Sequence, residues 1–457
     1  MERLDLVFAL RVLLRDPDAD AFADIVATHQ PADIVDAFED CNLTDLSRLL
    51  QTLGVAARAA LFPYFPADTQ DALLLELPRQ QVVDLFEYLP SDDRADLFNR
   101  LDEAAKAALL PALTRVERED ILRLASFPEG SVGSVTTSDY VAVNAEMSVA
   151  EALATIRASA VDKETVYSIY VVDFERRLIG TLSLRDLVLA DVDTPVATLM
   201  RREPVFLRAE WPRQKVAELI RRYDLLALPV IDAQTRMVGI VTVDDAMDID
   251  KAEDATKLAK FGGTAALGGP DLDLRESSFR QLFTTRVFWL AILTVFGVIT
   301  STYVAQQEEL LTEVIVLAAF VAPIIDMGGN TGSQSATLVI RAMALEQVRV
   351  TWRDIGFVIR RELPVAAMLG VSIAVLEAVL AYFSKGVGHE VLLVVGLTMM
   401  TVTVLGGVIG GLLPFMARRI GADPATLSSP MITSVMDLLG VVIYFGFAYA
   451  FLGHLLT

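Results

Sequence analysis

The chain contains few of the side chains on which disulfide-bonded folds and most transition-metal centres depend. Its 457 residues include one cysteine, Cys41, and three histidines. A single cysteine excludes a disulfide framework within the chain. His389–Glu390 begins a zinc-protease pattern, but Leu393 stands where the second histidine would be needed. The sequence also has no Gly-x4-Gly-Lys-Ser/Thr loop, so ATP-driven transport by that route is unsupported, and we expect no enzyme.

Positive charge is scarce as well, and the imbalance lies in one part of the chain. There are 39 Lys and Arg against 60 Asp and Glu, a formal net charge of −21, whereas residues 276–457 hold 10 basic and 12 acidic side chains. Residues 1–275 are therefore strongly acidic and should repel nucleic acid and attract cations. Because Met1–Asp5 lacks the basic and apolar regions of a signal peptide, we expect this part in the cytosol.

Long apolar runs are rare before about residue 285 and dominate after it. Hydrophobic residues make up 53% of the chain, and the mean hydropathy is +0.47. Five runs are long enough to cross a hydrocarbon layer of about 30 Å at about 1.5 Å per residue. They lie near 284–304, 313–345, 355–383, 391–416 and 430–455.

Basic side chains mark one side of these five predicted spans. Positively charged residues usually stay on the cytosolic side, and only Lys385 falls on the other side. We therefore predict a multi-pass protein of the cell inner (plasma) membrane with a cytosolic N-terminus and an external C-terminus. The residues on the cytosolic side are Arg280, Arg286, Arg341, Arg349, Arg353, Arg360, Arg361, Arg418 and Arg419.

The second span contains a stretch that should interrupt a membrane helix. Pro323–Thr337 combines a proline, Asp326, the paired Gly328 and Gly329, and several small polar side chains. Lipid cannot satisfy freed peptide groups, so a break survives only where protein or water lines it. A broken helix predicts a permeation pathway or a substrate site. The alternative is a glycine-rich helix-packing face.

Three carboxylates lie at or within the spans, at Asp326, Glu377 and Asp437. Each is costly at bilayer depth unless it faces water, an ion or a partner. Asp437 follows a Ser/Thr-rich segment. This setting suits hydrated Mg²⁺, because that ion prefers hard oxygen ligands and keeps most of its waters. One Asp437 per subunit would suffice if two subunits shared a pore axis. A capping or packing role is the alternative for Asp437, and we expect Asp326 to bond to backbone at the break.

The first third of the chain carries a 12-residue repeat. Each unit opens with a helix-start residue and ends on an apolar pair. Proline suits a first helical turn, where its missing donor is not needed. Neighbouring units must stack to bury their apolar pairs, which predicts a helical superhelix over 1–127. The units begin at Gly54, Pro66, Pro78, Pro90 and Asp102.

Residues 128–250 alternate strand-like and helical runs, and they also repeat internally. Gly180–Asp186 returns 59 positions later as Gly239–Asp245. A connecting helix, Met247–Phe261, should end at a hinge formed by Gly262–Gly263 and Gly268–Pro270. The expected strands are Tyr167–Val172 and Leu226–Ile231, and the expected helices are Val149–Ser159 and Val216–Tyr223.

Residues 128–250 resemble a tandem cystathionine-β-synthase (CBS) pair, and the whole chain resembles the MgtE family of magnesium channels. The motifs that carry the second resemblance are Gly328–Thr337, Arg341 and the segment Ser429–Gly440. The resemblance implies a multi-domain membrane protein that forms a homodimer with its pore on the two-fold axis. Its parts would be an N-terminal α-helical superhelix (1–127), tandem CBS (α/β) domains (128–194 and 195–250), a connecting plug helix (251–278) and a five-span α-helical transmembrane pore domain (279–457).

The resemblance also implies roles for individual residues. Asp437 would be the pore ion ligand, and Asp423 would lie near the cytosolic mouth. In this family cytosolic Mg²⁺ bridges acidic faces of the cytosolic domains and closes the pore. The pore-lining positions are Asp326, Gly328, Gly329 and Asn330. The other matching metal ligands are Asp92, Asp96, Asp224, Asp245, Asp248 and Glu253.

A nucleotide is a further cofactor that the resemblance suggests, besides Mg²⁺. CBS pairs often bind adenine nucleotides between their halves, and the matching positions for ATP here are Ser183, Arg185 and Asp186. Ser168 and Leu225 offer no aromatic ring to stack on adenine, so the sequence leaves ATP binding open.

Basic residues interrupt the acidic pattern at the expected Mg²⁺ sensor. We therefore expect fewer sensor ions and weaker Mg²⁺ feedback than the family pattern implies. These residues are Arg213, Lys215, Lys251, Lys257 and Lys260.

Two other functions stay open at this point. One is a secondary transporter that couples divalent cation movement to Na⁺ or H⁺, which buried carboxylates would permit. The other is a membrane receptor whose CBS pair senses nucleotide without transport. The sequence does not rank Mg²⁺ against Co²⁺, Mn²⁺ or Ni²⁺.

Overall fold

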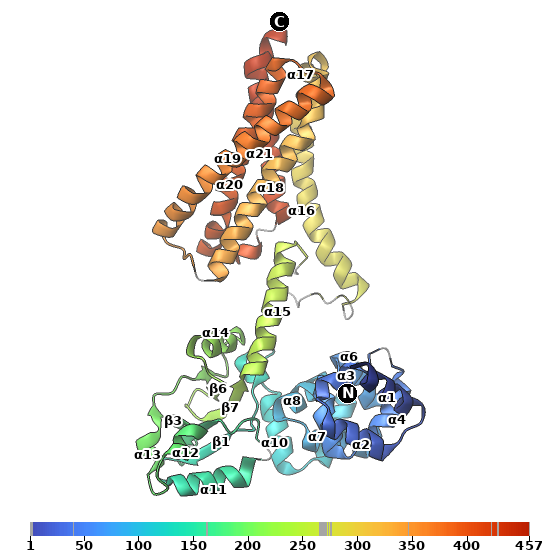
Figure 1. Ribbon diagram of the computed structural model, residues 1–457, viewed down its shortest axis with the longest axis vertical. Helices are drawn as coiled ribbons and strands as arrows, with labels where there is room; N and C mark the ends of the chain where they lie inside the picture. Colours follow the sequence, from blue (N-terminus) through green and yellow to red (C-terminus); the bar gives the residue numbers. More distant parts are fainter. Residues whose placement is uncertain are drawn as a thin grey trace. The chain divides into compact units, whose positions relative to one another are not determined.

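The computed structural model divides into two compact units, Met1–Lys251 and Ala252–Thr457. In Figure 1 the first unit runs from blue to green and holds the strands, while the second, yellow to red, is built of long helices. The structure describes residues 3–39, 41–160, 163–264, 272, 274, 277–345, 347–421, 423–426 and 429–456.

Short helices follow one another through the first part of the chain, and five of them begin where the repeat predicts. The residues that open the repeat units are the N-caps of α5–α9. The three prolines therefore precede the first helical turn, because the extended backbone of an N-cap also suits their fixed φ. Leucines at the same 12-residue spacing, from Leu61 to Leu109, are buried in one apolar core. The helices are α1 (Arg3–Arg15), α2 (Ala19–Thr28), α3 (Pro31–Asp36), α4 (Leu43–Leu50), α5 (Val55–Leu61), α6 (Ala67–Glu76), α7 (Arg79–Tyr88), α8 (Ser91–Arg100), α9 (Glu103–Leu109) and α10 (Arg115–Leu124).

Two small sheets follow, and they share one topology, as the internal repeat predicts. In each sheet a parallel strand pair is extended by an antiparallel strand. The first sheet has the order β1-β2-β3-β4 and the second β5-β6-β7. Even the register shift recurs, at Val171/Val172 and at Val230/Ile231. The strands are β1 (Val141–Asn144), β2 (Ser168–Val172), β3 (Leu178–Ser183), β4 (Arg201–Arg202), β5 (Leu207–Arg208), β6 (Ala227–Ile231) and β7 (Met237–Thr242).

The helices around these sheets agree closely with the predicted ones. The helix after β1 has the predicted bounds, and the helix after β5 begins two residues before the predicted start. The connecting helix α15 begins at Val243, directly after β7, and ends at Phe261 as predicted. Gly263 leaves the helix with a φ of +67°, whereas Gly268–Pro270 lies outside the described residues. The helices are α11 (Val149–Ser159), α12 (Leu184–Leu189), α13 (Val196–Leu199), α14 (Gln214–Tyr223) and α15 (Val243–Phe261).

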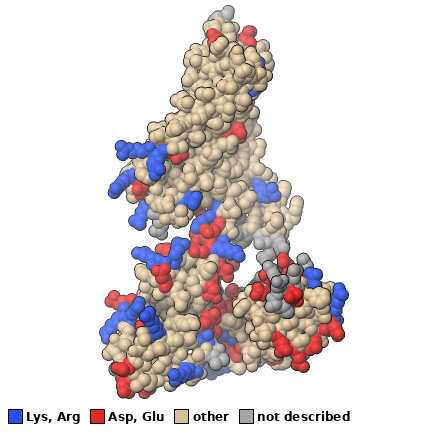
Figure 2. All heavy atoms as spheres, viewed as in Figure 1, with Lys and Arg blue, Asp and Glu red and all other residues tan. Residues whose placement is uncertain are grey.

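The second unit contains five helices that are long and apolar enough to cross a membrane. The ends of each helix lie within about five residues of the ends of a predicted span. Figure 2 shows few charged side chains along the visible face of this helical bundle and basic ones near one end of it. The helices are α16 (Phe279–Ala305), α18 (Ala318–Ala344), α19 (Trp352–Lys385), α20 (His389–Arg419) and α21 (Ser429–Leu452), with the short α17 (Glu308–Glu313) between the first two.

The predicted break in the second span is wrong, because α18 is one helix that includes Pro323. Its glycines serve close helix packing instead, which was the alternative interpretation. A Cβ added at Gly410 of α20 would lie 2.0 Å from the carbonyl oxygen of Gly332, and one at Gly406 would lie 2.6 Å from that of Gly328. Small residues let helix backbones approach in this way. Asp326 therefore has no freed backbone to bond, and it is exposed on an intact helix.

Candidate ion pathway, acidic cluster and nucleotide cleft

Asp437 lies in the middle of α21 with part of its carboxylate shielded. Its Oδ1 is buried and has no hydrogen-bond partner within the described part of the chain. Asp326 of α18 is the charged neighbour that acts on it electrostatically. The two helices pack tightly here, since a Cβ added at Gly329 would lie 2.7 Å from the Thr433 side chain. A buried oxygen without a donor, beside a second carboxylate, is a place where a cation would be stabilised.

A cavity of about 520 Å³ lies along the same stretch of α18. Asn330, Ser333 and Gln334 line it from α18, and Ser429 lines it from α21. The hydroxyls of Ser333 and Ser429 are 2.9 Å apart and share a hydrogen bond. Phe261, the last residue of α15, also lines the cavity. Met327, Leu369 and Ile373 also contribute to the lining, so the cavity combines polar groups with apolar side chains.

The structure gives Asp423 and Glu253 ammonium partners. Lys260 Nζ lies 2.9 Å from Asp423 Oδ2, and Lys257 Nζ lies 3.0 Å from a Glu253 oxygen. Burial alone would raise the pKa of Asp423, but the hydrogen bonds from Lys260 and from the Ala425 amide outweigh it and lower that pKa. Both residues were predicted as metal ligands, and in this structure both bind lysine.

An acidic cluster forms in the first unit where α8 meets the CBS sheets, and acidic side chains gather there in Figure 2. Ser91, the first residue of α8, bonds through its amide to Asp139 Oδ2 at 3.1 Å and through its hydroxyl to Thr137 at 2.9 Å. These bonds fix the start of α8 against the segment before β1. The carboxylates that interact electrostatically with one another there are Asp92, Asp93, Asp96, Asp139, Glu164, Asp244 and Asp245.

Burial and mutual repulsion raise the pKa values of five of these carboxylates, Asp92, Asp93, Asp96, Glu164 and Asp245. Burial, with the charges of Asp92 and Asp244, raises the pKa of Asp245 to about 8. Burial and neighbouring carboxylates likewise raise the pKa of Asp93 to about 7 and that of Glu164 to about 7. Asp92 shifts in the same direction, and its buried Oδ1 has no hydrogen-bond partner among the described residues. Such groups would bind a cation in place of the protons they hold.

The cluster does not form a closed metal cage. Among the described residues, no group of three or more His, Cys, Asp or Glu side chains has the geometry to hold a metal ion. The predicted Asp92, Asp96 and Asp245 come together in the cluster. Asp224 instead ends α14 in a left-handed conformation, and Asp248 is exposed on α15. The arrangement is therefore a diffuse negative surface, which suits hydrated ions more than a tightly ligated one.

A cleft of about 320 Å³ lies between the two CBS sheets. Ser183 and Asp186 line it, and together they form the capping box at the start of α12. The backbone hydrogen bond from Ser183 lowers the pKa of Asp186. Arg201 and Tyr170 also line the cleft, whereas Arg185 is exposed on α12. The Tyr170 ring is only 1% exposed and packs in a hydrophobic core, so it offers no free face for adenine.

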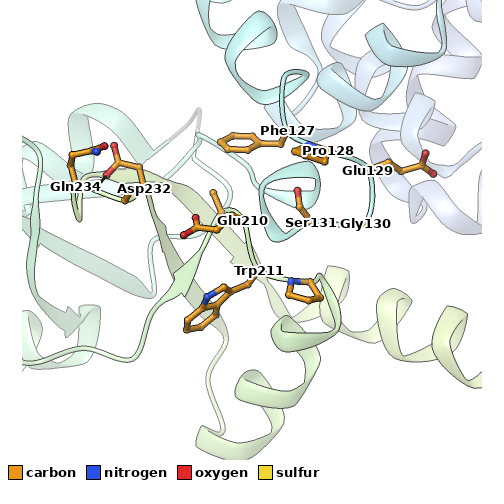
Figure 3. A pocket seen from close by; sticks show the side chains of 12 residues that line it. Phe127, Pro128, Glu129, Gly130, Ser131, Glu210, Trp211, Asp232 and Gln234 are labelled. Atoms are coloured by element: carbon orange, nitrogen blue, oxygen red, sulfur yellow. Dashed lines mark hydrogen bonds between the residues drawn. The ribbon is translucent and has the colours of Figure 1, made fainter. Parts of the chain in front are cut away.

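Another hollow, of about 560 Å³, lies beside the second CBS sheet and is drawn in Figure 3. Glu210 and Trp211 line it from the loop after β5, Asp232 and Gln234 from the turn between β6 and β7, and Phe127–Ser131 from the segment after α10. None of the residues predicted from the sequence lines this hollow. The candidate sites therefore lie elsewhere in the unit.

The comparisons with known proteins identify the domains of this chain. A family model described as a divalent cation transporter matches residues 321–447, one described as the MgtE intracellular N domain matches 29–130, and CBS domain models match 132–193 and 196–251. The chain is 40% identical over 341 residues to the magnesium transporter MgtE of Thermus thermophilus, which covers 74% of this chain and 73% of that protein. This chain belongs to the MgtE family.

Other MgtE relatives extend the similarity to the whole chain. The magnesium transporter MgtE of Bacillus subtilis is 29% identical over 465 residues, covering 99% of this chain and 98% of that protein. A crystal structure of the cytosolic domain of the Mg²⁺ channel MgtE in complex with ATP matches with a TM-score of 0.51 and 34% identity, covering 53% of this chain and 99% of that one. The soluble part of a magnesium transporter matches with a TM-score of 0.53 and 28% identity, covering 55% and 99%. The predicted fold class is confirmed.

Several residues of this MgtE protein were missed by sequence reasoning. Asp93 and Asp244 adjoin predicted ligands, so the doubled Asp could have indicated them. Asp139 and Glu164 lie in connecting segments and carry no such signal. Glu362 of α19 is a further carboxylate within a span, and it accepts a hydrogen bond from the buried Ser335 of α18. Its position in the predicted third span was the signal that could have found it.

Proposed function

We propose that this MgtE protein is a homodimeric, Mg²⁺-selective channel through which Mg²⁺ enters the cell down the membrane voltage. The observation that carries the proposal is the buried Oδ1 of Asp437, which has no hydrogen-bond partner among the described residues. Two copies of Asp437 facing a shared axis would supply two negative charges for one hydrated divalent cation. The names of the relatives support Mg²⁺ as the ion.

Voltage is a sufficient driving force for this entry. An inside-negative potential supplies about 2.3 kcal/mol per charge per 100 mV, and about twice that for a divalent ion. No coupled ion is then required. Discrete single-channel currents in patches would support a channel, whereas pH-dependent or Na⁺-dependent flux without such currents would favour the secondary transporter.

The proposed gate is cytosolic Mg²⁺ acting on the acidic cluster. The carboxylates of α8 and α15 repel one another unless protons or cations neutralise them. Cytosolic Mg²⁺ would favour the arrangement in which α8 is docked, so its concentration would control the closed state. This requires the N-terminus in the cytosol and the C-terminus outside, as the arginine distribution predicts.

ATP is the proposed ligand of the cleft between the CBS sheets. Ser183 stands at a helix start, and Arg201 supplies a positive charge for phosphate. The matching structure of a relative's cytosolic domain with ATP supports this proposal. Arg185, which was predicted to contribute, would have to reach the cleft from the exposed side of α12.

The decisive variant is Asp437→Ala. We expect it to reduce Mg²⁺ influx into liposomes by at least about tenfold, because losing even about 1.4 kcal/mol of ion stabilisation is a tenfold change. The dimer should stay intact in size-exclusion chromatography with light scattering. Glu377→Gln, which removes a carboxylate from α19, is the matched control and should keep normal influx. An Asp437→Ala protein that still conducts Mg²⁺ selectively would refute the pore assignment.

A further inference from the structure

The end of α15 is joined to the loop between α20 and α21 by an ion pair. Lys260 Nζ lies 2.9 Å from Asp423 Oδ2, and the Ala425 amide donates to Asp423 Oδ1 at 3.0 Å. Both oxygens of this carboxylate are therefore engaged. The two side chains are each about one third exposed, at 33% and 35%, so the pair is partly shielded from solvent screening.

The lysines of α15 also neutralise its own acidic residues. Lys257 lies 3.0 Å from Glu253 and 3.6 Å from Asp254, one turn before Lys260. Two of the positions at which the family resemblance implies a bound cation, Glu253 and Asp423, thus face ammonium groups. A divalent cation would have to displace a lysine to bind either one.

The ion pair adjoins the proposed pathway. Phe261, the residue after Lys260, lines the cavity along α18 together with Asn330 and Ser429. A contact that holds Lys260 to Asp423 therefore also keeps Phe261 at that cavity.

We propose that Lys260 is a built-in cation that latches the end of α15 to Asp423, so that this contact forms without Mg²⁺. The proposal rests on the proposed channel function for its consequence, which is that the latch holds the cytosolic end of the pore partly closed even at low Mg²⁺. Mg²⁺ would then regulate this protein through the acidic cluster of the first unit and not at Asp423.

Hydrogen exchange of the full-length protein in detergent tests the latch without measuring transport. Amides of the last turns of α15 should be equally protected from exchange in EDTA and in about 10 mM Mg²⁺. Lys260→Gln should speed the exchange of these amides in EDTA by about fivefold, which is the upper end of the effect expected from losing a partly exposed ion pair. Lys251→Gln, an exposed lysine on the same helix, is the control and should change nothing.

A charge swap separates an ion pair from a metal site. Asp423→Lys alone should lose the protection, and the double variant Lys260→Glu with Asp423→Lys should regain most of it, because the pair is re-formed with opposite signs. A metal site would not be rescued by this swap. Protection that requires Mg²⁺ in the unmodified protein, or that ignores Lys260→Gln, would overturn the latch.

Influx through the same variants tests the consequence separately. At low internal Mg²⁺, Lys260→Gln should raise influx over the unmodified protein, and the swapped pair should bring it back down. If the unmodified protein carried no Mg²⁺ at all, the channel function would fail while the exchange result for the latch would still stand.

Discussion

Carboxylates that are crowded together and partly shielded from water hold protons more readily than isolated ones do. The raised pKa values of Asp93, Glu164 and Asp245 mean that the folded cluster binds more protons than the unfolded chain between about pH 5 and pH 8. Without Mg²⁺, the stability of the Met1–Lys251 unit should therefore fall as pH rises through this window. This is opposite in sign to a carboxylate whose pKa is lowered by an ion pair.

Mg²⁺ binding to the cluster should release protons near pH 7. Calorimetry of the full-length protein in two buffers of different ionisation enthalpy would measure the number released, which should fall towards zero at pH 9, where the cluster is already ionised. Asp245→Asn should lower the release at pH 7, and Asp248→Asn, an exposed carboxylate on the same helix, should leave it unchanged. Release that is the same at pH 7 and pH 9 would contradict a proton-holding cluster.

The close packing of α18 against α20, two whole helices, depends on glycine. A Cβ at position 410 would meet the backbone oxygen of Gly332 at 2.0 Å. Backbone atoms cannot rotate out of the way, so the two helices would have to separate and lose packing along their length. The motif that suggested a break thus keeps α18 close to its neighbour and holds Asn330 at the cavity.

Gly410→Ala should destabilise the membrane unit by about 1–3 kcal/mol, the usual range for overpacking. The midpoint temperature of thermal unfolding in detergent, monitored by light scattering, should therefore decrease. Gly446→Ala is the matched control, because its added Cβ meets nothing within 4 Å and alanine has the higher helix propensity. If both substitutions changed the unfolding midpoint equally, helix propensity and not close backbone approach would explain the change.

The proposed regulation by Mg²⁺ would depend on more than one domain, because the acidic cluster is shared between α8 and the segments around the CBS sheets. Without α8, the carboxylates of Glu164 and Asp245 lose the charge of Asp92 that raises their pKa values. The rest of the Met1–Lys251 unit should then bind Mg²⁺ more weakly.

Removal of residues 1–130 should therefore leave a conductive but poorly regulated channel. Mg²⁺ uptake into liposomes, measured against internal Mg²⁺, should stay high where uptake by the full chain falls. The double substitution of Asp92 and Asp93 by Asn, which keeps α8, should shift the dependence in the same direction. A truncated protein that shuts off as steeply as the full chain would place the sensor elsewhere.

The sequence alone determined those features of this protein that depend on the local residue pattern. The 12-residue repeat, the duplicated Gly180–Asp186 segment and the five apolar runs each reflect a periodicity that neighbouring residues enforce. Helix starts, spans and strands were predictable to within a few residues for that reason. The resemblance to the MgtE family rested on equally local motifs.

Tertiary structure alone decided what depends on residues far apart in the chain. Whether Gly328 breaks a helix or packs it is settled by the neighbouring α20, and Lys260 meets Asp423 across 163 positions. Asp139 and Glu164 join the acidic cluster only because the sheet brings their loops to α8. Charge and close packing act through space, so sequence order does not reveal which carboxylate finds a lysine and which stays unpaired.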